Sequence, residues 1–273
     1  MDKPLYIRGK RAHRGAYERG GSMQTIAIIA QKGGTGKTTT AHATGAGLAG
    51  RGYKVLLIDA DAQGNLTYAV GADNKRAGTY EILTRQAAAA DAIQAAPPVD
   101  ILTASPSLAL ADLNINQAGR EYRMREALQA IAGRYDYCII DTPPALGTLT
   151  VNALTAASTA VITAQADIFS LQAIGALSAT IEAIRQHSNL GLTVGGILLT
   201  RYNPRTIISR DMLELLADTA RRLDTKVYAA TIREATALKE AQAMRQDIYQ
   251  YNPNSNAAAD YTAFIGELLG GTT

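Results

Sequence analysis

A glycine-rich loop between a strand-like run and a helix-favouring run constrains the fold of this chain more than any other feature. The apolar run covers residues 25–30, the loop residues 31–39, and the helix-favouring run begins at residue 40. Glycines let backbone N–H groups point inward at phosphate oxygens, and the helix that follows adds its positive dipole end. This setting predicts that Lys37 reaches the β- and γ-phosphates of a nucleotide and that the Thr38 hydroxyl binds Mg²⁺.

The loop departs from the common phosphate-loop pattern at two positions. Gln31 stands where that pattern has its first glycine, and Lys32 adds a second lysine directly before a diglycine. The alternative is a glycine turn that binds nothing, but two lysines crowded into a tight turn are hard to explain without an anion. The nucleotide-binding residues that the loop predicts are Gly33, Gly34, Thr35, Gly36, Lys37, Thr38 and Thr39.

Strand-like and helix-favouring runs alternate along most of the chain, which predicts an α/β fold. Strands are predicted at residues 26–30, 54–59, 99–103, 135–141, 159–163, 194–200 and 227–232. Helices are predicted at residues 38–51, 80–85, 86–96, 108–133 with an interruption at Gly119, 171–187, 207–223, 236–245 and 257–268. Such alternation favours a doubly wound, mostly parallel sheet with helices on both faces, as in P-loop nucleotide-binding proteins.

Composition narrows the class of protein. The chain has 273 residues, of which 47% are hydrophobic and 19% charged, as in ordinary globular domains. Its single cysteine, Cys138, excludes an intramolecular disulfide and argues against a cysteine-ligated cluster, so we expect it to be a small buried side chain. No apolar run has membrane-spanning length and no secretory signal is visible, so we expect a cytoplasmic protein.

Residues 1–22 differ from the rest, which divides the chain into a basic extension and a domain at residues 23–273. The extension carries six basic and two acidic residues and no apolar periodicity, which leaves a net charge of −1 for the remainder. It fits a disordered arm that contacts DNA phosphates, a leader added for expression, or translated upstream sequence with Met23 as the natural start. We favour the last, because Glu18–Gly21 can be encoded by a sequence resembling a bacterial ribosome-binding site.

Three aspartates follow predicted strands. Asp141 ends an apolar strand before Thr142 and two prolines, an arrangement that delivers one carboxylate to Mg²⁺ beside a phosphate loop. Asp59 and Asp61 end the strand at residues 54–59, where ligands bind in open α/β sheets. The alternatives are a simple strand-end turn for Asp141 and capping of the next turn by Asp59 and Asp61.

Together these motifs resemble the ParA/MinD group of ATPases, and ParA-type partition ATPases in particular. The resemblance runs from about Met23 to the C-terminal helix and includes the two-lysine loop, D-x-D-x-Q-G-N at 59–65 and I-I-D-x-P-P at 139–144, with Ala62 replacing a usual proline. It implies that Lys32 reaches the nucleotide of a second subunit and that Asp61 positions the attacking water. It further implies that Asp59 organises the metal shell or a switch, and that Asn203 lies near adenine, although capping of its own turn is an equal alternative.

The resemblance also implies DNA binding through basic residues of the C-terminal third. The candidates are Arg205, Arg210, Arg221, Arg222, Arg233, Lys239 and Arg245. Acidic residues are interleaved with them, so an ordinary solvated surface is an equal alternative. Ala237 stands where other members place a second arginine, which leaves the set of contacting residues open.

The function implied is an ATPase with Mg²⁺ that forms a homodimer with ATP, binds double-stranded DNA without sequence preference near the bacterial nucleoid, and is stimulated by a ParB-like partner. A MinD-like membrane role is disfavoured because residues 261–269 contain no Lys or Arg. One cysteine is too few for a nitrogenase-reductase relative, and dethiobiotin synthetase lacks the second lysine. An ATP-gated transcriptional repressor and a positioner of protein cargo remain as alternatives.

Overall fold

The computed structural model describes residues 23–203 and 207–270, and within helix α9 the side chains of residues 207–212 are not described. The predicted extension at residues 1–22 and the predicted DNA contact Arg205 lie outside the described residues, and Arg210 is placed only by its backbone.

In this part of the chain, eight strands form one sheet in the order β3-β4-β2-β5-β1-β6-β7-β8. All neighbouring strands pair in parallel except β3 and β4, which are antiparallel. The strands are β1 Gln24–Ile29, β2 Val55–Asp59, β3 Gln94–Ala96, β4 Val99–Leu102, β5 Tyr137–Asp141, β6 Thr159–Ala164, β7 Thr193–Tyr202 and β8 Ile232–Arg233. The predicted doubly wound α/β architecture is confirmed.

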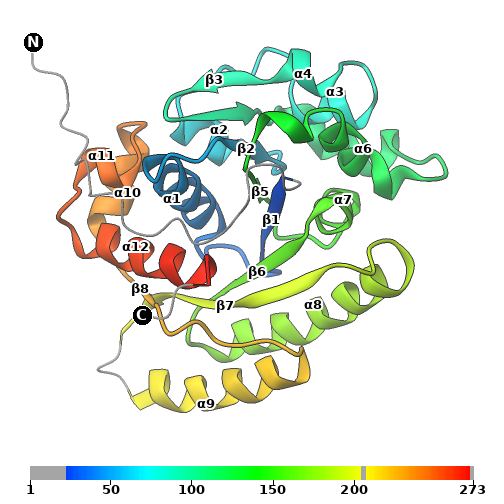
Figure 1. The fold of residues 1–273 in the computed structure, drawn as a ribbon. Coiled ribbons are helices and arrows are strands. Elements are labelled where there is room, and N and C mark those ends of the chain that lie inside the picture. The colour runs from blue at the N-terminus through cyan, green and yellow to red at the C-terminus, as the bar shows by residue number, and fades with distance from the viewer. Residues whose placement is uncertain (1–22, 204–206, 271–273) are drawn as a thin grey trace, which may run out of the picture.

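Helices cover both faces of the sheet (Figure 1). The α-helices are α1 Lys37–Gly50, α2 Asn65–Ala69, α3 Thr79–Leu83, α4 Ala89–Ala92, α5 Ala111–Asn114, α6 Arg123–Gln129, α7 Thr148–Ala156, α8 Ile168–His187, α9 Ile207–Arg222, α10 Thr236–Ala243, α11 Ile248–Tyr251 and α12 Asn256–Leu268. Short 3₁₀ turns occupy Pro106–Leu110, Arg120–Tyr122 and Ala132–Arg134. No described helix is both long enough and apolar enough to cross a membrane.

Alternating side chains of the central strands enter two separate cores. Ala27 and Ile29 of β1 pack with α6, α7 and α8 on one face, whereas Ile26 and Ile28 pack with α1 and α12 on the other. The central strands are buried on both faces, so their sequences read as continuous apolar runs rather than alternating ones.

Three predicted segments differ from the structure. Residues 86–96 were predicted helical from their alanines, but only α4 is helical there and Gln94–Ala96 pairs with β4 as strand β3. Residues 108–133 are broken into short helical pieces rather than one interrupted helix. The predicted strand at 227–232 is reduced to an isolated bridge between Val227 and Ile197 and to the short strand β8. At Gln94–Ala96, pairing with β4 outweighs the local helix propensity of the alanines.

Candidate nucleotide site

The loop between β1 and α1 lies at the carboxyl edge of the sheet, where β2, β5, β6 and β7 also end. Gly34 and Gly36 adopt positive φ angles of 76° and 78°, which favour glycine. A Cβ atom at Gly33 or Gly34 would meet no other atom within 4 Å, so the space next to these two residues is open. Lys37 begins α1, which places a helix N-terminus at this opening.

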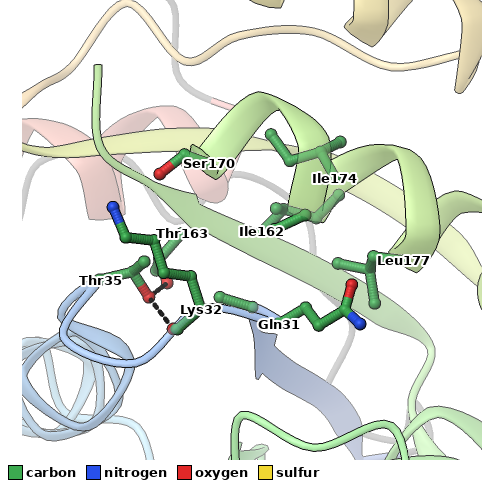
Figure 2. Close-up of a pocket in the computed structure, with 10 residues that line it drawn as sticks. Gln31, Lys32, Thr35, Ile162, Thr163, Ser170, Ile174 and Leu177 are labelled. Carbon is green, nitrogen blue, oxygen red and sulfur yellow. Dashed lines mark hydrogen bonds between the residues drawn. The ribbon is translucent and has the colours of Figure 1, made fainter. Parts of the chain in front are cut away.

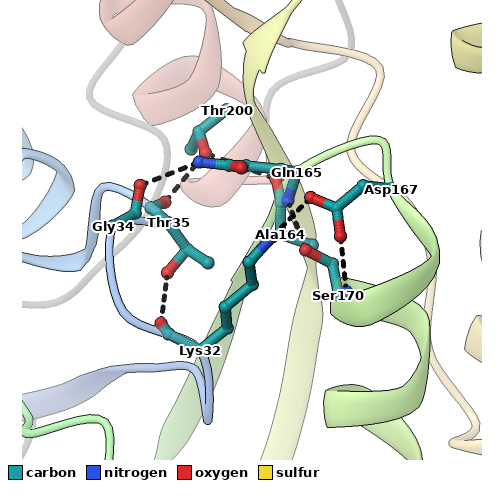
Figure 3. Close-up of polar contacts among 8 residues, drawn as sticks. All are labelled: Lys32, Gly34, Thr35, Ala164, Gln165, Asp167, Ser170 and Thr200. Atoms are coloured by element: carbon teal, nitrogen blue, oxygen red, sulfur yellow. Dashed lines mark hydrogen bonds and ion pairs between the residues drawn. The ribbon is translucent and has the colours of Figure 1, made fainter.

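Strands β6 and β7 hold the loop from one side. The Thr200 hydroxyl donates to the carbonyl of Thr35 at 2.8 Å, and the Gln165 amide donates to the carbonyl of Gly34 at 2.8 Å (Figure 3). The hydroxyls of Thr35 and Thr163 are hydrogen-bonded at 3.0 Å (Figure 2). From α10, Gln242 donates to the hydroxyl of Thr39 at 2.9 Å. These bonds fix the loop before any ligand binds.

Lys37 is buried and points toward the carboxylate side of the site. Its Nζ donates to the carbonyl of Lys32 at 3.4 Å, a long bond that a ligand oxygen could replace. Burial lowers the pKa of Lys37, while Asp141 and Asp61 oppose that shift. A buried cation at the mouth of a helix N-terminus suits a multiply charged anion such as a nucleotide phosphate.

Asp141 ends β5 as a fully buried carboxylate. Neither of its oxygens has a well-formed hydrogen bond among the described residues. Burial, and then the nearby Asp59 carboxylate, raises the pKa of Asp141, and the adjacent Thr38 hydroxyl and Lys37 ammonium oppose the shift. A buried carboxylate that lacks partners and lies beside a hydroxyl fits a cation ligand that the free chain does not supply.

Asp59, at the end of β2, is also buried but is fully engaged within the chain. It accepts hydrogen bonds from the backbone of Asp61 at 3.1 Å and from the backbone and hydroxyl of Thr67, each at 2.8 Å. Burial raises the pKa of Asp59 to about 6, with these bonds acting in the opposite direction. The geometry therefore favours the predicted switch role, in which Asp59 ties β2 to α2, over direct metal binding.

Asp61 is partly exposed and lies two residues beyond β2. One of its carboxylate oxygens accepts the backbone N–H of Gln63 at 3.0 Å, so the turn-capping alternative is realised. The other oxygen accepts no hydrogen bond from the described residues, and the carboxylate is close enough to raise the pKa of Lys37. Asp61 can therefore cap its turn and still face a ligand.

Lys32 extends to the opposite side of the loop from Lys37. Its ammonium forms an ion pair with Asp167 at 2.6 Å and lies 5.8 Å from the centroid of the Phe169 ring. A small pocket between the loop and α8 is lined in part by Ile162, Ile174 and Lys32 (Figure 2). In the single chain, the predicted cross-subunit lysine is thus bound to a carboxylate of its own chain (Figure 3).

The residues present fit Mg²⁺ only together with a nucleotide. Among the described residues no three His, Cys, Asp or Glu side chains converge on one point that could hold a metal. Thr38 and Asp141 supply one hydroxyl and one carboxylate, and Mg²⁺ characteristically completes its octahedral shell with substrate phosphates and water. The unpartnered Asp141 carboxylate is the observation that supports this fit.

Asn203 follows β7, three residues after Thr200, which contacts the loop. Its exposed side chain lies at the same edge of the sheet as the phosphate loop. This position agrees with either an adenine contact or a turn cap.

The predicted DNA contacts do not gather into one unpaired patch. Arg221 pairs with Asp218, Arg233 forms a bidentate pair with Asp260, and Lys239 lies 3.7 Å from Glu234. Arg222 and Arg245 are exposed and form no ion pair in the part of the chain that is described, although Arg245 lies over the Tyr68 ring. Helices α9 and α10 also lie apart in the fold (Figure 1).

Residues that hold the loop were missed by the sequence predictions. They lie near the carboxyl ends of two strands: Thr163 and Thr200 within the last residues of β6 and β7, and Gln165 and Asp167 just beyond β6. Asp167 is the N-cap of α8 and accepts the backbone N–H of Ser170 at 2.8 Å. An aspartate directly before a helical run carries a sequence signal for the cap but none for the distant lysine.

Comparison with known proteins places the chain in a family. Residues 23–194 match the family described as AAA domain. The Bacillus subtilis sporulation initiation inhibitor protein Soj is 38% identical over 89% of this chain and 97% of its own length. The chromosome partitioning protein ParA of Caulobacter vibrioides is 35% identical over 90% of this chain and 94% of its own length.

A solved structure is also similar to this chain in sequence and fold. The cobyrinic acid a,c-diamide synthase of Mycobacterium smegmatis is 33% identical, with a TM-score of 0.78 over 90% of this chain and 94% of its own. It has been crystallised with ADP and magnesium and with an ATP analogue and magnesium. Nucleotide and Mg²⁺ therefore bind a relative that has the same fold.

Proposed function

The chain belongs to the ParA group of the ParA/MinD P-loop ATPases, and from this membership we propose that it acts through an ATP-bridged dimer that binds DNA. It is an ATPase of the partition type and uses ATP and Mg²⁺. Beyond this activity, the dimer closes over ATP, binds DNA and is released by a partner.

The main support for an ATP-bridged dimer is that the two loop lysines, Lys37 and Lys32, point in opposite directions. Lys37 is buried on the side of Asp141 and Asp61, where it can neutralise the phosphates of its own nucleotide. Lys32 points away from that side and is partly exposed beside α8. A lysine that does not face its own phosphate site is placed to reach a nucleotide held by another copy, where it would stabilise the charge that develops on phosphoryl transfer.

Within one subunit, each site residue receives one role. The backbone of residues 33–39 and the Lys37 ammonium hold the phosphates, and Asn203 contacts the adenine side. Thr38 and Asp141 hold Mg²⁺, which when bound neutralises phosphate charge. Asp61 orients the attacking water through its free carboxylate oxygen, and Asp59 links the end of β2 to α2 as a switch.

DNA binding follows from pairing two copies. Among the described side chains of the C-terminal third, a single chain presents few unpaired cations, because Arg221, Arg233 and Lys239 lie beside acidic groups. A closed dimer doubles the number of unpaired basic groups, and Arg222 and Arg245 are examples among the described residues. These groups would bind DNA phosphates and make no sequence-specific contact with the bases. A ParB-like partner then stimulates hydrolysis, and the dimer separates and leaves the DNA.

Binding to DNA under three nucleotide conditions tests this proposal. The purified protein is titrated with non-specific duplex DNA in ATP, in ADP and without nucleotide, at two salt concentrations. We expect binding only with ATP, and weaker binding at the higher salt concentration. Recognition of one operator without nucleotide would instead support the ATP-gated repressor.

We assign these activities to residues 23–273 and none of them to residues 1–22. The match to the AAA domain family begins at residue 23, which supports this division. Mass analysis of the N-terminus of untagged native protein tests it, with a first residue of Met23 expected. A native chain that retains the six basic residues of the extension would instead favour the DNA-contacting arm.

A further inference from the structure

The β6–α8 junction contacts both the backbone of the phosphate loop and the side chain of Lys32. Asp167 accepts the Lys32 ammonium at 2.6 Å, and Gln165 donates to the carbonyl of Gly34 at 2.8 Å. Both side chains of the ion pair are about one-third exposed, at 31% and 29%. The pair is therefore neither buried nor freely solvated, and it lies on the exposed edge of the nucleotide site (Figure 3).

Asp167 is held in place independently of the lysine. Its other carboxylate oxygen, Oδ1, caps α8 by accepting the backbone N–H of Ser170 at 2.8 Å, and Oδ2 accepts Lys32. Although partial burial alone would raise the pKa of Asp167, the hydrogen bonds from Lys32 and Ser170 lower it. A pre-oriented carboxylate costs little further entropy to bind a cation, which makes it an effective acceptor for Lys32.

The side chains next to this pair are apolar and exposed. Phe169 is 66% exposed and Ile168 is 47% exposed, both in the first turn of α8. The Lys32 ammonium lies 5.8 Å from the Phe169 ring centroid, so the cation rests between a carboxylate and an aromatic ring. These contacts keep Lys32 against its own chain while the second subunit is absent.

We propose that Asp167 is a latch that holds Lys32 within the free subunit and must release it before two subunits can close over ATP. This inference rests on the proposed cross-subunit role of Lys32. Closure exchanges one carboxylate partner for the phosphates of the other copy, which carry more charge. Because the latch competes with the dimer and not with ATP binding in the same chain, it opposes closure without weakening the nucleotide site.

The isosteric substitution Asp167→Asn separates the two functions of this residue. Asparagine can still cap α8 but cannot form the ion pair. A partly exposed ion pair contributes roughly two- to fivefold to an equilibrium constant, and a symmetric dimer opens two latches, so we expect the dimer to tighten on the order of tenfold. The affinity of the monomer for an ATP analogue should not change.

The experiment measures dimer dissociation by analytical ultracentrifugation of the full chain with Mg²⁺ and a non-hydrolysable ATP analogue. Asp167→Glu, which restores the charge, should return the dissociation constant toward that of the unsubstituted chain. The matched control is Asp247→Asn, since Asp247 caps α11 through Tyr249 and Gln250 and forms no ion pair with the described residues. In a Lys32→Ala background, Asp167→Asn should have no effect on dimerisation.

A second measurement does not depend on the dimer. In nucleotide-free protein, acylation of Lys32 followed by mass spectrometry should be several-fold faster in Asp167→Asn, while acylation of the exposed Lys54 stays constant. If the Asp167→Asn variant dimerises with an unchanged or higher dissociation constant, the latch alone is overturned. A chain that stays monomeric with the analogue at every concentration overturns the proposed function, and the latch with it.

Discussion

Asp59 and Asp141 lie opposite each other as register partners at the carboxyl ends of the parallel strands β2 and β5. Both carboxylates are fully buried, but Asp59 accepts three hydrogen bonds from its own chain and Asp141 accepts none of good geometry. The two aspartates are thus equally buried, but only Asp59 has hydrogen-bond partners in its own chain. This difference assigns Asp59 to the fold of the chain and Asp141 to a ligand.

The first prediction concerns Asp141→Asn. Removing a buried, unpartnered carboxylate should raise the unfolding free energy of the nucleotide-free protein by about 1–3 kcal/mol. The same change should abolish the part of ATP binding that depends on Mg²⁺, because the amide is a poor replacement for a charged ligand. Denaturant unfolding and titration with an ATP analogue, with and without Mg²⁺, measure the two effects.

Asp59→Asn is the matched control for that prediction. It places an NH₂ group where the carboxylate accepts hydrogen bonds from Asp61 or Thr67. The substitution should therefore lower the unfolding free energy by about 1–3 kcal/mol. Stabilisation by Asp59→Asn, or destabilisation by Asp141→Asn, would reverse the assignment of the two residues.

The second prediction concerns Asp61→Ala. Because only one carboxylate oxygen caps the turn at Gln63, the variant should fold with a loss of about 1 kcal/mol and bind ATP normally. Hydrolysis should fall by two orders of magnitude or more, by analogy with the loss of other positioned catalytic groups. Phosphate release and analogue binding are measured on the same preparation, and a variant that hydrolyses ATP at the unsubstituted rate would exclude Asp61 from the reaction.

The third prediction is a pH dependence from His42, which is buried in α1. Burial lowers the pKa of His42 from 6.5 to about 4, so the folded protein keeps the imidazole neutral while the unfolded chain protonates it. The resulting stability is fully present above pH 6.5 and is lost as the pH falls to about 4, with a total of about 3 kcal/mol.

Unfolding of the nucleotide-free protein between pH 7 and pH 4 tests this dependence. His42→Gln should lose less stability over that range than the unsubstituted chain, whereas the exposed-site variant His187→Gln should follow the unsubstituted chain. Parallel curves for all three proteins would show that His42 is not the group responsible.

The fourth prediction compares two glycines of α1. A side chain added at Gly45 would lie 2.5 Å from Cδ2 of the buried Leu57, so Gly45→Ala should destabilise the fold by about 1–3 kcal/mol. Gly50 has nothing within 4 Å, and Gly50→Ala should be neutral or stabilise by up to about 1 kcal/mol through helix propensity. Thermal unfolding of the two variants checks the difference, and equal effects would mean that α1 does not pack closely on β2.

The sequence predicts the sheet and the phosphate loop because both depend on local patterns. Continuous apolar runs identify β1, β2 and β5, and the glycine spacing identifies the loop. The loop's supports could not be predicted in the same way, because Asp167 meets Lys32 across 135 positions of sequence. Similarly, residues 94–96 have the local propensity of a helix, but pairing with β4 and the buried Gln94 side chain make them a strand.

Subunit complementation tests the central claim, that Lys32 acts on the nucleotide of the other copy. Lys32→Ala protein, which keeps Asp61, is mixed in equal amounts with Asp61→Ala protein, which keeps Lys32, and ATP hydrolysis is measured for each alone and for the mixture. We expect each variant to be inactive alone and the mixture to recover about a quarter of the unsubstituted rate, since half of the dimers are mixed and each has one complete site. A mixture as inactive as its components, or full activity in Lys32→Ala alone, would contradict the account.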